Sequence, residues 1–293
     1  MQNAIIIGAQ NVGFSLVRSL KDKGIRLMVL ATDPYDFAQY SRFVQEWRRV
    51  PSPATSSKAF MAWLLHSASR WEGALLLPSS DAALLSLCRN RHLILQHYRA
   101  ALPDLEPLEN LIHKGRLYRL AQELHLPVPR FHQPGSLEEL RQLRPHLQFP
   151  CLLKPCESSL FFANFQCKLF RLETFEELEN AWTKAQNHSL ETIICELIPG
   201  ADDHLFFYAS YRTEDGTVTG EVCVQKLRQH PPGFGVGRVA RTVPMMDPLR
   251  ASTQKLLAHC GYRGFSSAEF KKDPRDNSYK LMEINLTESR IIQ

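Results

Sequence analysis

Two glutamates near the C-terminus, Glu269 and Glu283, are the residues of this chain best suited to chemistry. Each lies in a segment that reads as a strand, and a run of turn-forming residues, 273–278, separates them. A hairpin centred near Asp276 would place the two carboxylates opposite each other, with Asn285 on the same side because strand side chains alternate. Like charges directly opposite each other destabilise a sheet, and a cation between them would reverse that effect. Such hard oxygen ligands favour Mg2+ over zinc, whereas a solvated hairpin with its charges in water is the alternative.

Composition sets the limits within which such a site must be built. The chain has 293 residues, of which 44% are hydrophobic and 22% charged, enough for two or three compact units. It contains no apolar run long enough for a membrane span, and its net charge of +5 is too small to argue for nucleic-acid binding. Seven cysteines are spread singly, and the start lacks the basic segment of a signal peptide. We therefore expect a cytoplasmic protein with reduced thiols.

The first hundred residues alternate between strand and helix signals. Apolar runs at 4–7 and 25–31 flank a helical segment, and a further strand at 74–77 is followed by another helix. This order predicts an α/β fold with a doubly wound parallel sheet. The pair Gly8 and Gly13 lacks the middle glycine of a dinucleotide fingerprint, so we favour a packing role; a nicotinamide-dependent enzyme that uses Gly8 to Asp33 is an alternative.

Three further features of the second half could bind an anionic ligand. Lys154 lies in an apolar strand, where a buried ammonium needs a phosphate or a salt-bridge partner. The strand at 192–198 runs into a turn followed by Asp202 and Asp203; it could pair with an adenine edge and ribose, or be an edge strand with a solvated acidic turn. Basic residues flank the glycine-rich segment 231–237, which is either an anion clamp or a flexible loop. The eleven histidines show no ligand spacing.

Taken in order, these pieces resemble the ATP-grasp superfamily. The landmarks are Lys114 before a Pro-x-Pro, Phe-Pro-x-x-x-Lys-Pro ending at 155, Glu-x-Ile-Pro-Gly-x-Asp-Asp at 196–203, and Glu-Ile-Asn at 283–285. The segments 226–237 and 270–276 resemble the carboxylate-amine ligase branch, near D-aspartate ligase and carbamoyl-phosphate-synthase-like proteins.

The resemblance implies three units along the chain. Residues 1–105 would be a pre-ATP-grasp, Rossmann-like domain. Residues 106–194 would form the N-terminal lobe and lid of a two-lobed α+β ATP-grasp domain, and 195–293 its C-terminal lobe with the metal-binding hairpin. Relatives often continue further, so the last unit would be a shortened one.

The resemblance also implies a role for each candidate residue. ATP and Mg2+ would be the cofactors, with two ions and Mn2+ as a substitute. A carboxylate and an amine, an amino acid or small peptide-like molecule, would be joined through an acylphosphate, without nucleic acid or membrane and in a protein that could be a homodimer. The implied residues are Lys114, Lys154 and Lys168 for phosphates, Glu196, Leu197 and Ile198 for adenine, Asp202 and Asp203 for ribose, Lys226 and Arg228 for the γ-phosphate or carboxylate, and Glu269, Glu283 and Asn285 for metal.

The second half of the chain departs from the family pattern at two places. No glycine follows Lys154 in the segment 156–162, where many members carry a phosphate loop, and Lys168 would supply the replacement cation. The family usually reads Glu-Ile-Asn-Pro-Arg, whereas Leu286 and Thr287 stand here in place of Pro-Arg, with Arg290 as the candidate substitute. Thr287 and the shortened C-terminal unit favour a second hypothesis, a catalytically impaired, nucleotide-binding homologue with a binding or regulatory role, whereas the intact lysines and metal ligands oppose it.

Overall fold

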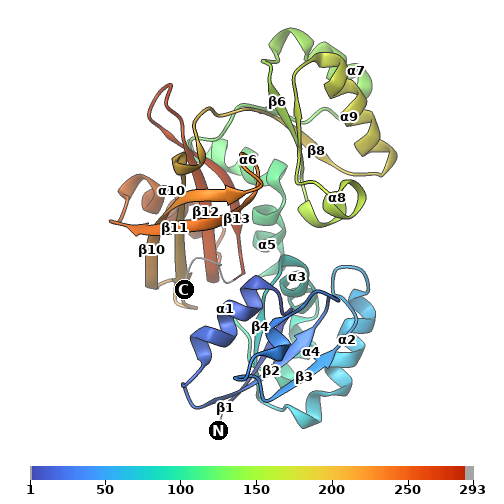
Figure 1. Cartoon of the computed structure of the whole chain (residues 1–293), viewed down its shortest axis with the longest axis vertical. Helices are drawn as coiled ribbons and strands as arrows, with labels where there is room; N and C mark the ends of the chain where they lie inside the picture. The colour runs from blue at the N-terminus through green and yellow to red at the C-terminus, as the bar shows by residue number, and fades with distance from the viewer. Residues whose placement is uncertain (1, 288–293) are drawn as a thin grey trace.

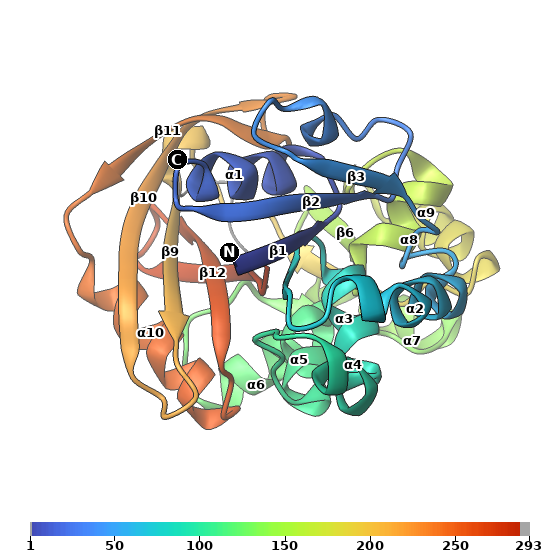
Figure 2. The same cartoon turned by 90° about the horizontal axis from the view of Figure 1, so that it is seen from below.

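The N-terminal unit is built on a four-stranded parallel sheet, in a computed structural model that describes residues 2–287. The sheet order is β3-β2-β1-β4, which confirms the predicted doubly wound arrangement. Helix α1 lies on one face, and α2, α3 and α4 lie on the other (Figure 2). The bounds are β1 Gln2–Ile7, α1 Asn11–Leu20, β2 Ile25–Ala31, β3 Glu46–Arg49, α2 Ser57–His66, β4 Leu75–Pro78, α3 Asp81–Arg89 and α4 Arg91–His97.

The glycine pair after β1 is explained by close packing. A Cβ atom on Gly13 would lie 2.1 Å from the backbone oxygen of Gly8. Gly8 itself has a φ of +92°, and a Cβ there would lie 2.5 Å from the Ser79 Oγ at the end of β4. The turn between β1 and α1 thus needs glycine at both positions for steric reasons alone.

Two helices lead from this unit into a small lobe, defined as residues 131–196. Helix α5 (Leu105–Ile112) and helix α6 (Lys114–Glu123) lie between the N-terminal unit and the two lobes (Figure 1). The small lobe is a four-stranded sheet in the order β5-β8-β6-β7, with antiparallel pairing throughout. Its elements are β5 Phe131–His132, α7 Leu137–Gln142, β6 Cys151–Pro155, α8 Ser158–Phe165, β7 Phe170–Leu172, α9 Phe175–Asn187 and β8 Thr192–Glu196.

The large lobe, residues 205–285, is a five-stranded antiparallel sheet in the order β11-β10-β9-β12-β13. Helix α10 packs against it (Figure 1). Strand β11 is the outer edge, and six of its eight residues are exposed. The bounds are β9 Leu205–Arg212, β10 Val218–His230, β11 Val236–Val243, α10 Asp247–His259, β12 Gly264–Lys272 and β13 Tyr279–Asn285. Short 3-10 turns occur at Ala38–Tyr40, Ala68–Arg70, Arg144–His146 and Asp202–His204.

One hydrophobic core runs through most of the molecule. It joins one face of the parallel sheet to α5, α6 and the inner face of the large lobe, through side chains such as Leu108, Tyr118 and Phe270. The small lobe has a separate core under α7 and α9, centred on Leu153 and Trp182. The N-terminal unit and large lobe therefore share their packing, and the small lobe joins that core through one face of its sheet, at residues such as Leu152 and Ile193, while its other face has a core of its own.

Two predictions on composition can be compared with the structure. All seven cysteines are free thiols, as expected for a chain without disulfides. Over residues 2–287, none of the helices is both long and apolar enough to cross a membrane.

Candidate functional site

The two glutamates lie directly opposite each other, as the turn-forming run predicted. Glu269 in β12 pairs with Glu283 in β13, and Ser267 pairs with Asn285 two residues further along the hairpin. The apolar residues that alternate with them, such as Ala268 and Ile284, are buried in the core. The hairpin therefore presents two carboxylates and an amide on the face that is not used for packing.

Each carboxylate is paired with a lysine from a different element. The Lys226 Nζ in β10 lies 3.5 Å from the Glu269 Oε1, and the Lys114 Nζ at the start of α6 lies 3.5 Å from the Glu283 Oε2. Lys114 also donates to the Ser158 Oγ of α8 at 3.1 Å. Two like charges on neighbouring strands are thus held together by cations brought from elsewhere in the fold.

The two carboxyl groups titrate in opposite directions. Burial, with the charge of Glu283 beside it, raises the pKa of Glu269 despite the nearby Lys226. Burial also acts to raise the pKa of Glu283, but Lys114, Lys168 and Lys154 outweigh it and hold that pKa below its ordinary value. Glu283 is therefore the more firmly ionised of the pair, and Glu269 is the one that protonates first as the pH falls.

Lys154 is the most unusual of the lysines. It lies in β6 with only 7% of its surface exposed. Within residues 2–287, no carboxylate lies within ion-pair distance of its ammonium group, so the salt-bridge alternative is not realised there. A buried ammonium without such a partner is costly unless an anion joins it. The positive charge of Lys154 helps to lower the pKa of Glu283, so Lys154 lies on the side of the small lobe that faces the carboxylate pair.

Lys168 completes a group of four lysines around the carboxylate pair. It lies between α8 and β7, and its Nζ donates to the backbone oxygen of Gly235 in the glycine-rich segment at 3.4 Å. Its charge acts on both Glu269 and Glu283. The two lobes thus meet across this site, with Lys168 linking the small lobe to the segment between β10 and β11.

A hydrogen-bond chain links Lys226 to the predicted ribose-binding acids. The Lys226 Nζ donates to the Gln229 Oε1 at 3.3 Å, and the Gln229 Nε2 donates to the Asp202 Oδ1 at 2.6 Å. The backbone N–H of Gln229 donates to the Asp202 Oδ2 at 3.2 Å. Asp202 is therefore engaged by β10, while the neighbouring Asp203 is exposed. Gln229 is 7% exposed and was missed by the sequence analysis, which included it only in the segment 226–237 that resembles the ligase branch.

The segment predicted to contact adenine begins with a glutamate held by two arginines. The Glu196 Oε1 accepts the backbone N–H of Arg130 at 2.9 Å, and its Oε2 accepts from the Arg275 Nη2 at 2.9 Å. Burial acts to raise the pKa of Glu196, but these donors outweigh it and lower the pKa below its ordinary value. Its side chain is thus fully engaged. Leu197 is half-buried and Ile198 is buried, so their backbone groups are what they can offer a ligand.

Comparison with known proteins adds to this geometry. No protein-family model matches the chain. The curated D-aspartate ligase of Enterococcus faecium is 26% identical over 228 residues, which make up 74% of this chain and 53% of that protein. The chain thus spans about half the length of this relative.

Solved structures match over almost the whole chain. The L-amino acid ligase of Bacillus licheniformis superposes with a TM-score of 0.73 at 17% identity, over 98% of this chain and 67% of that one. A biotin carboxylase domain dimer from Hydrogenobacter thermophilus, in complex with MgADP, ADP and bicarbonate, gives 0.71 at 14% identity, over 97% and 64%. This is the ATP-grasp fold.

Not every residue implied by the ATP-grasp resemblance joins the cluster. Arg228 lies next to an irregularity in the pairing of β10 with β11, and its side chain is exposed. In the part of the chain that the structure describes, no hydrogen bond or ion pair connects Arg228 to the other candidate residues. Thr287 is buried, whereas Arg290 lies outside the described residues.

Two residues beside the ATP-grasp hairpin were not found from sequence. Asp81 lies in the first turn of α3, and burial raises its pKa to about 6. The charge of Glu283 adds to this rise, and the charge of Lys114 partly opposes it. The Ser267 Oγ, on the hairpin and 1% exposed, has no hydrogen-bond partner in residues 2–287. Asp81 lies almost two hundred positions before the hairpin, so only the fold could bring it there. Ser267 lies two residues from Glu269 in β12, so strand alternation places its hydroxyl on the face that carries the carboxylates.

Proposed function

We propose that this protein is an ATP- and Mg2+-dependent carboxylate-amine ligase that joins an amino acid or small peptide-like amine to a carboxylate. The observation that carries this proposal is the meeting of four lysines, from α6, β6, β10 and the segment before β7, at the Glu269–Glu283 pair. This arrangement fits a polyphosphate with its cation, because the phosphates would neutralise the lysines and the cation would neutralise the glutamates.

The candidate residues divide between nucleotide and metal. Lys114, Lys154 and Lys168 would hold phosphates, the backbone at 196–198 the adenine, and Asp203 or Asp202 the ribose. Glu269, Glu283 and Asn285 would hold Mg2+ or Mn2+, as one ion or two, with the unpaired Ser267 hydroxyl nearby. When bound, the metal would supply positive charge to the phosphoryl group in transfer.

The remaining roles concern the reaction itself. Lys226 would steady the γ-phosphate or the substrate carboxylate, since Gln229 and Glu269 hold its ammonium at the site. Arg228 would do so only after a movement of β10. The carboxylate oxygen would attack the γ-phosphorus as the bond to ADP breaks, forming an acylphosphate. The amine would then form the C–N bond and lose a proton as phosphate leaves.

Three structural units would serve this reaction. We propose the division 1–105, 106–194 and 195–293, with the nucleotide between the second and third units and the acceptor beside Asp81 of the first. The boundary at 194 falls inside β8, whose last residue, Glu196, begins the link to the large lobe.

Thermal unfolding with ATP, with and without Mg2+, tests this function. A ligand at about 100 times its Kd stabilises the folded state by about 2.7 kcal/mol, a rise in Tm of several degrees. We expect this rise with MgATP in the wild type and its loss in Glu283→Gln. The control Glu173→Gln changes a half-exposed acid of the small lobe and should keep the rise.

The result selects between the ligase and its rival. If MgATP shifts the Tm, amino-acid mixtures are screened for phosphate release. Binding without release in any mixture would favour the nucleotide-binding homologue, and no shift at all would contradict both readings. A shift with NADH that survives Lys154→Met would instead support the nicotinamide reading.

A further inference from the structure

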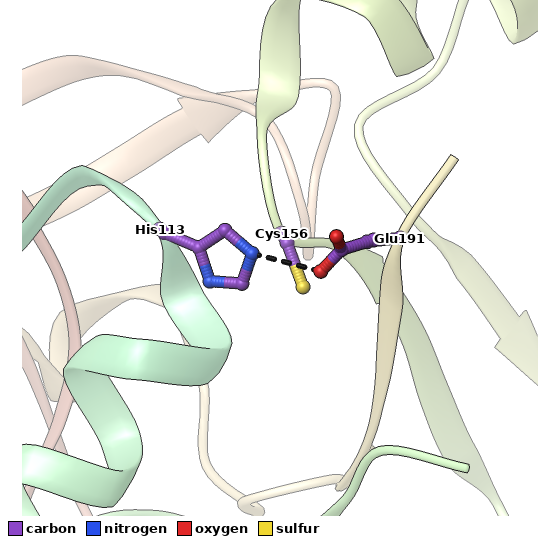
Figure 3. A group of neighbouring side chains, drawn as sticks. All are labelled: His113, Cys156 and Glu191. Carbon is purple, nitrogen blue, oxygen red and sulfur yellow. Dashed lines mark hydrogen bonds and ion pairs between the residues drawn. The ribbon is translucent and has the colours of Figure 1, made fainter. Parts of the chain in front are cut away.

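Two members of a second group of ligand-type side chains lie close to Lys114 and Lys154 in the sequence, and the proposed ligase reaction does not use this group. His113 precedes α6, Cys156 follows β6, and Glu191 precedes β8 (Figure 3). One ligand atom from each lies within 4.8 Å of the other two. The His113 Nε2 and the Glu191 Oε2 are 3.0 Å apart. These residues are 35 or more positions apart in sequence, so their spacing gave no signal.

We propose that His113, Cys156 and Glu191 form a binding site for a zinc-class divalent cation. An imidazole nitrogen, a thiolate sulfur and a carboxylate oxygen are the three ligand types that zinc takes in proteins. Thiolate favours zinc or cobalt over Mg2+, so this site differs in chemistry from the all-oxygen hairpin. The site does not depend on the proposed ligase activity.

The geometry needs little change to admit the ion. Zinc bonds of 2.0–2.1 Å to nitrogen and oxygen place tetrahedral ligand atoms about 3.3 Å apart, close to the 3.0 Å between His113 and Glu191. His113 and Cys156 are buried, whereas the Glu191 side chain is 70% exposed. The ion could therefore enter from the Glu191 side, where water would complete a four-coordinate site.

Donors around the cluster are placed to support the ligands. The Gln133 Nε2 donates to the Cys156 Sγ at 3.6 Å and to the Glu191 Oε2 at 3.4 Å. The Arg119 Nη1 donates to the Gln133 Oε1 at 2.7 Å, which fixes the orientation of the amide. The backbone N–H of Gly115 also acts to lower the pKa of the thiol, against the effect of burial. Such hydrogen bonds stabilise a metal-bound thiolate and orient its neighbours.

Binding must displace protons from two ligands. Burial raises the pKa of Cys156 to about 11, so the metal must take the place of the thiol proton. The His113 Nδ1 accepts the backbone N–H of Arg116 at 3.2 Å, so the neutral ring carries its proton on Nε2. Moving that proton to Nδ1 gives up a helix cap, which costs roughly tenfold in affinity. Structural zinc sites have dissociation constants of roughly 10⁻⁷ M or lower. A roughly tenfold loss from the helix cap is small beside that affinity.

The proposed zinc-class site lies beside two of the lysines of the carboxylate cluster. His113 directly precedes Lys114, and Cys156 comes two residues after Lys154. The backbone N–H of Lys114 already donates to the Cys156 oxygen at 3.1 Å. A bound ion would tie the start of α6 to the end of β6 and fix the spacing of the two lysines.

Cobalt and zinc titrations of the full-length chain test the proposal. The tag-free protein, treated with chelator and then dialysed, is titrated with CoCl2 and the thiolate-to-cobalt charge-transfer absorption is followed. ZnCl2 is then added to displace the cobalt. We expect one equivalent of cobalt with this absorption, its loss in Cys156→Ser, and affinity reduced more than about tenfold in His113→Gln and Glu191→Gln.

Matched controls separate this site from other thiols, histidines and carboxylates. Cys260→Ser removes a thiol outside the cluster that is partly buried, and His97→Gln removes a histidine that also pairs with a glutamate, Glu72. Both should leave the cobalt absorption unchanged, as should Glu283→Gln at the hairpin. Absence of the absorption in the folded wild type would overturn the proposal, and so would its persistence in Cys156→Ser. If Cys156→Ser does not fold, Glu191→Gln decides, because Glu191 is exposed; an unchanged affinity there overturns the proposal.

Discussion

In the absence of a metal ion, Lys226 and Lys114 supply the positive charge that compensates Glu269 and Glu283. Lys226 and Lys114 each lie 3.5 Å from one glutamate of the hairpin pair, so the two carboxylates are compensated before any metal arrives. A metal that binds the pair would release both ammonium groups toward a nucleotide. Phosphate binding and metal binding should therefore favour each other, because each supplies what the other leaves uncompensated.

The buried charge of Lys154 should lower the stability of the folded protein, although it serves the proposed phosphate site. Its ammonium is buried without a carboxylate partner in residues 2–287, so replacing it by the apolar Lys154→Met removes a buried charge. We expect the Tm without ligand to equal or exceed that of the wild type, while the MgATP-dependent rise disappears. Lys154→Arg keeps the charge and serves as the control. A marked fall in the ligand-free Tm of Lys154→Met, measured by scanning calorimetry, would contradict this view of Lys154.

Asp81 should make stability depend on pH. Its folded pKa of about 6 lies above the ordinary value of 3.8, so the folded state favours the protonated form and loses stability as the pH rises from about 4 to above 6. Asp81→Asn should therefore be more stable than the wild type at pH 7.5, by on the order of 1–3 kcal/mol. The gain should shrink as the pH falls through 6. Urea unfolding at pH 7.5 and pH 5 measures it, and an equal gain at both would count against a raised pKa.

At the scale of elements, the β12–β13 hairpin also connects the two lobes. Arg275 in its turn donates to the Asp273 Oδ2 at 2.6 Å and to the Glu196 Oε2 at 2.9 Å. Asp273 is 1% exposed, whereas Arg275 is 44% exposed. The same hairpin that carries the proposed metal ligands thus fixes the end of β8, which leads into the segment proposed to contact adenine.

Removal of Arg275 should be costly because it leaves a buried carboxylate without its cation. We expect Arg275→Gln to lose about 3 kcal/mol of unfolding free energy at neutral pH. Arg130→Gln removes a 61% exposed partner of Glu196 and should cost under about 1 kcal/mol. Denaturant unfolding compares the two variants.

The deficit of Arg275→Gln should also depend on pH. Hydrogen bonds from Arg275 lower the pKa of Asp273, and those from Arg130 and Arg275 lower that of Glu196 against the effect of burial. This stabilisation is present above the ordinary carboxyl pKa values and is lost as the pH falls through the lowered ones. The difference between wild type and Arg275→Gln should therefore shrink in acid; a constant difference would assign the loss to packing.

The hairpin was predictable because its signals are local. Turn formers at 273–278 and alternating apolar residues set the register of Glu269 against Glu283. Helix α8 was not predicted, because its aromatic residues favour helix weakly and are explained only by packing of Phe161 on Phe165 and Phe170. Contributions from distant segments, such as Asp81 and Gln229, carry no local signal, since only the tertiary fold brings them to the site.

At the scale of the molecule, the division of the cores predicts which part moves. The large lobe shares its core with the N-terminal unit, whereas the small lobe has a second core of its own at Leu153 and Trp182 and joins the shared core through only one face of its sheet. Lys168 bridges the lobes through the backbone oxygen of Gly235. We expect MgATP to slow amide hydrogen exchange in α8 and in residues 231–237, with little change in β1 and β2. Exchange that slows equally in all of these would argue against independent motion of the small lobe.

The exposed edge at β11 has a consequence outside the site. An outer strand offers unpaired backbone groups to any other chain, and six of the eight residues of β11 are in solvent. Arg238 and Arg241 give this strand like charges that a second copy would have to bring together. Replacing both arginines with valine would leave a nearly uncharged, β-branched strand at the rim of the sheet. We expect that double variant to self-associate at concentrations where the wild type does not, so these two charges would disfavour edge-to-edge association of the sheet.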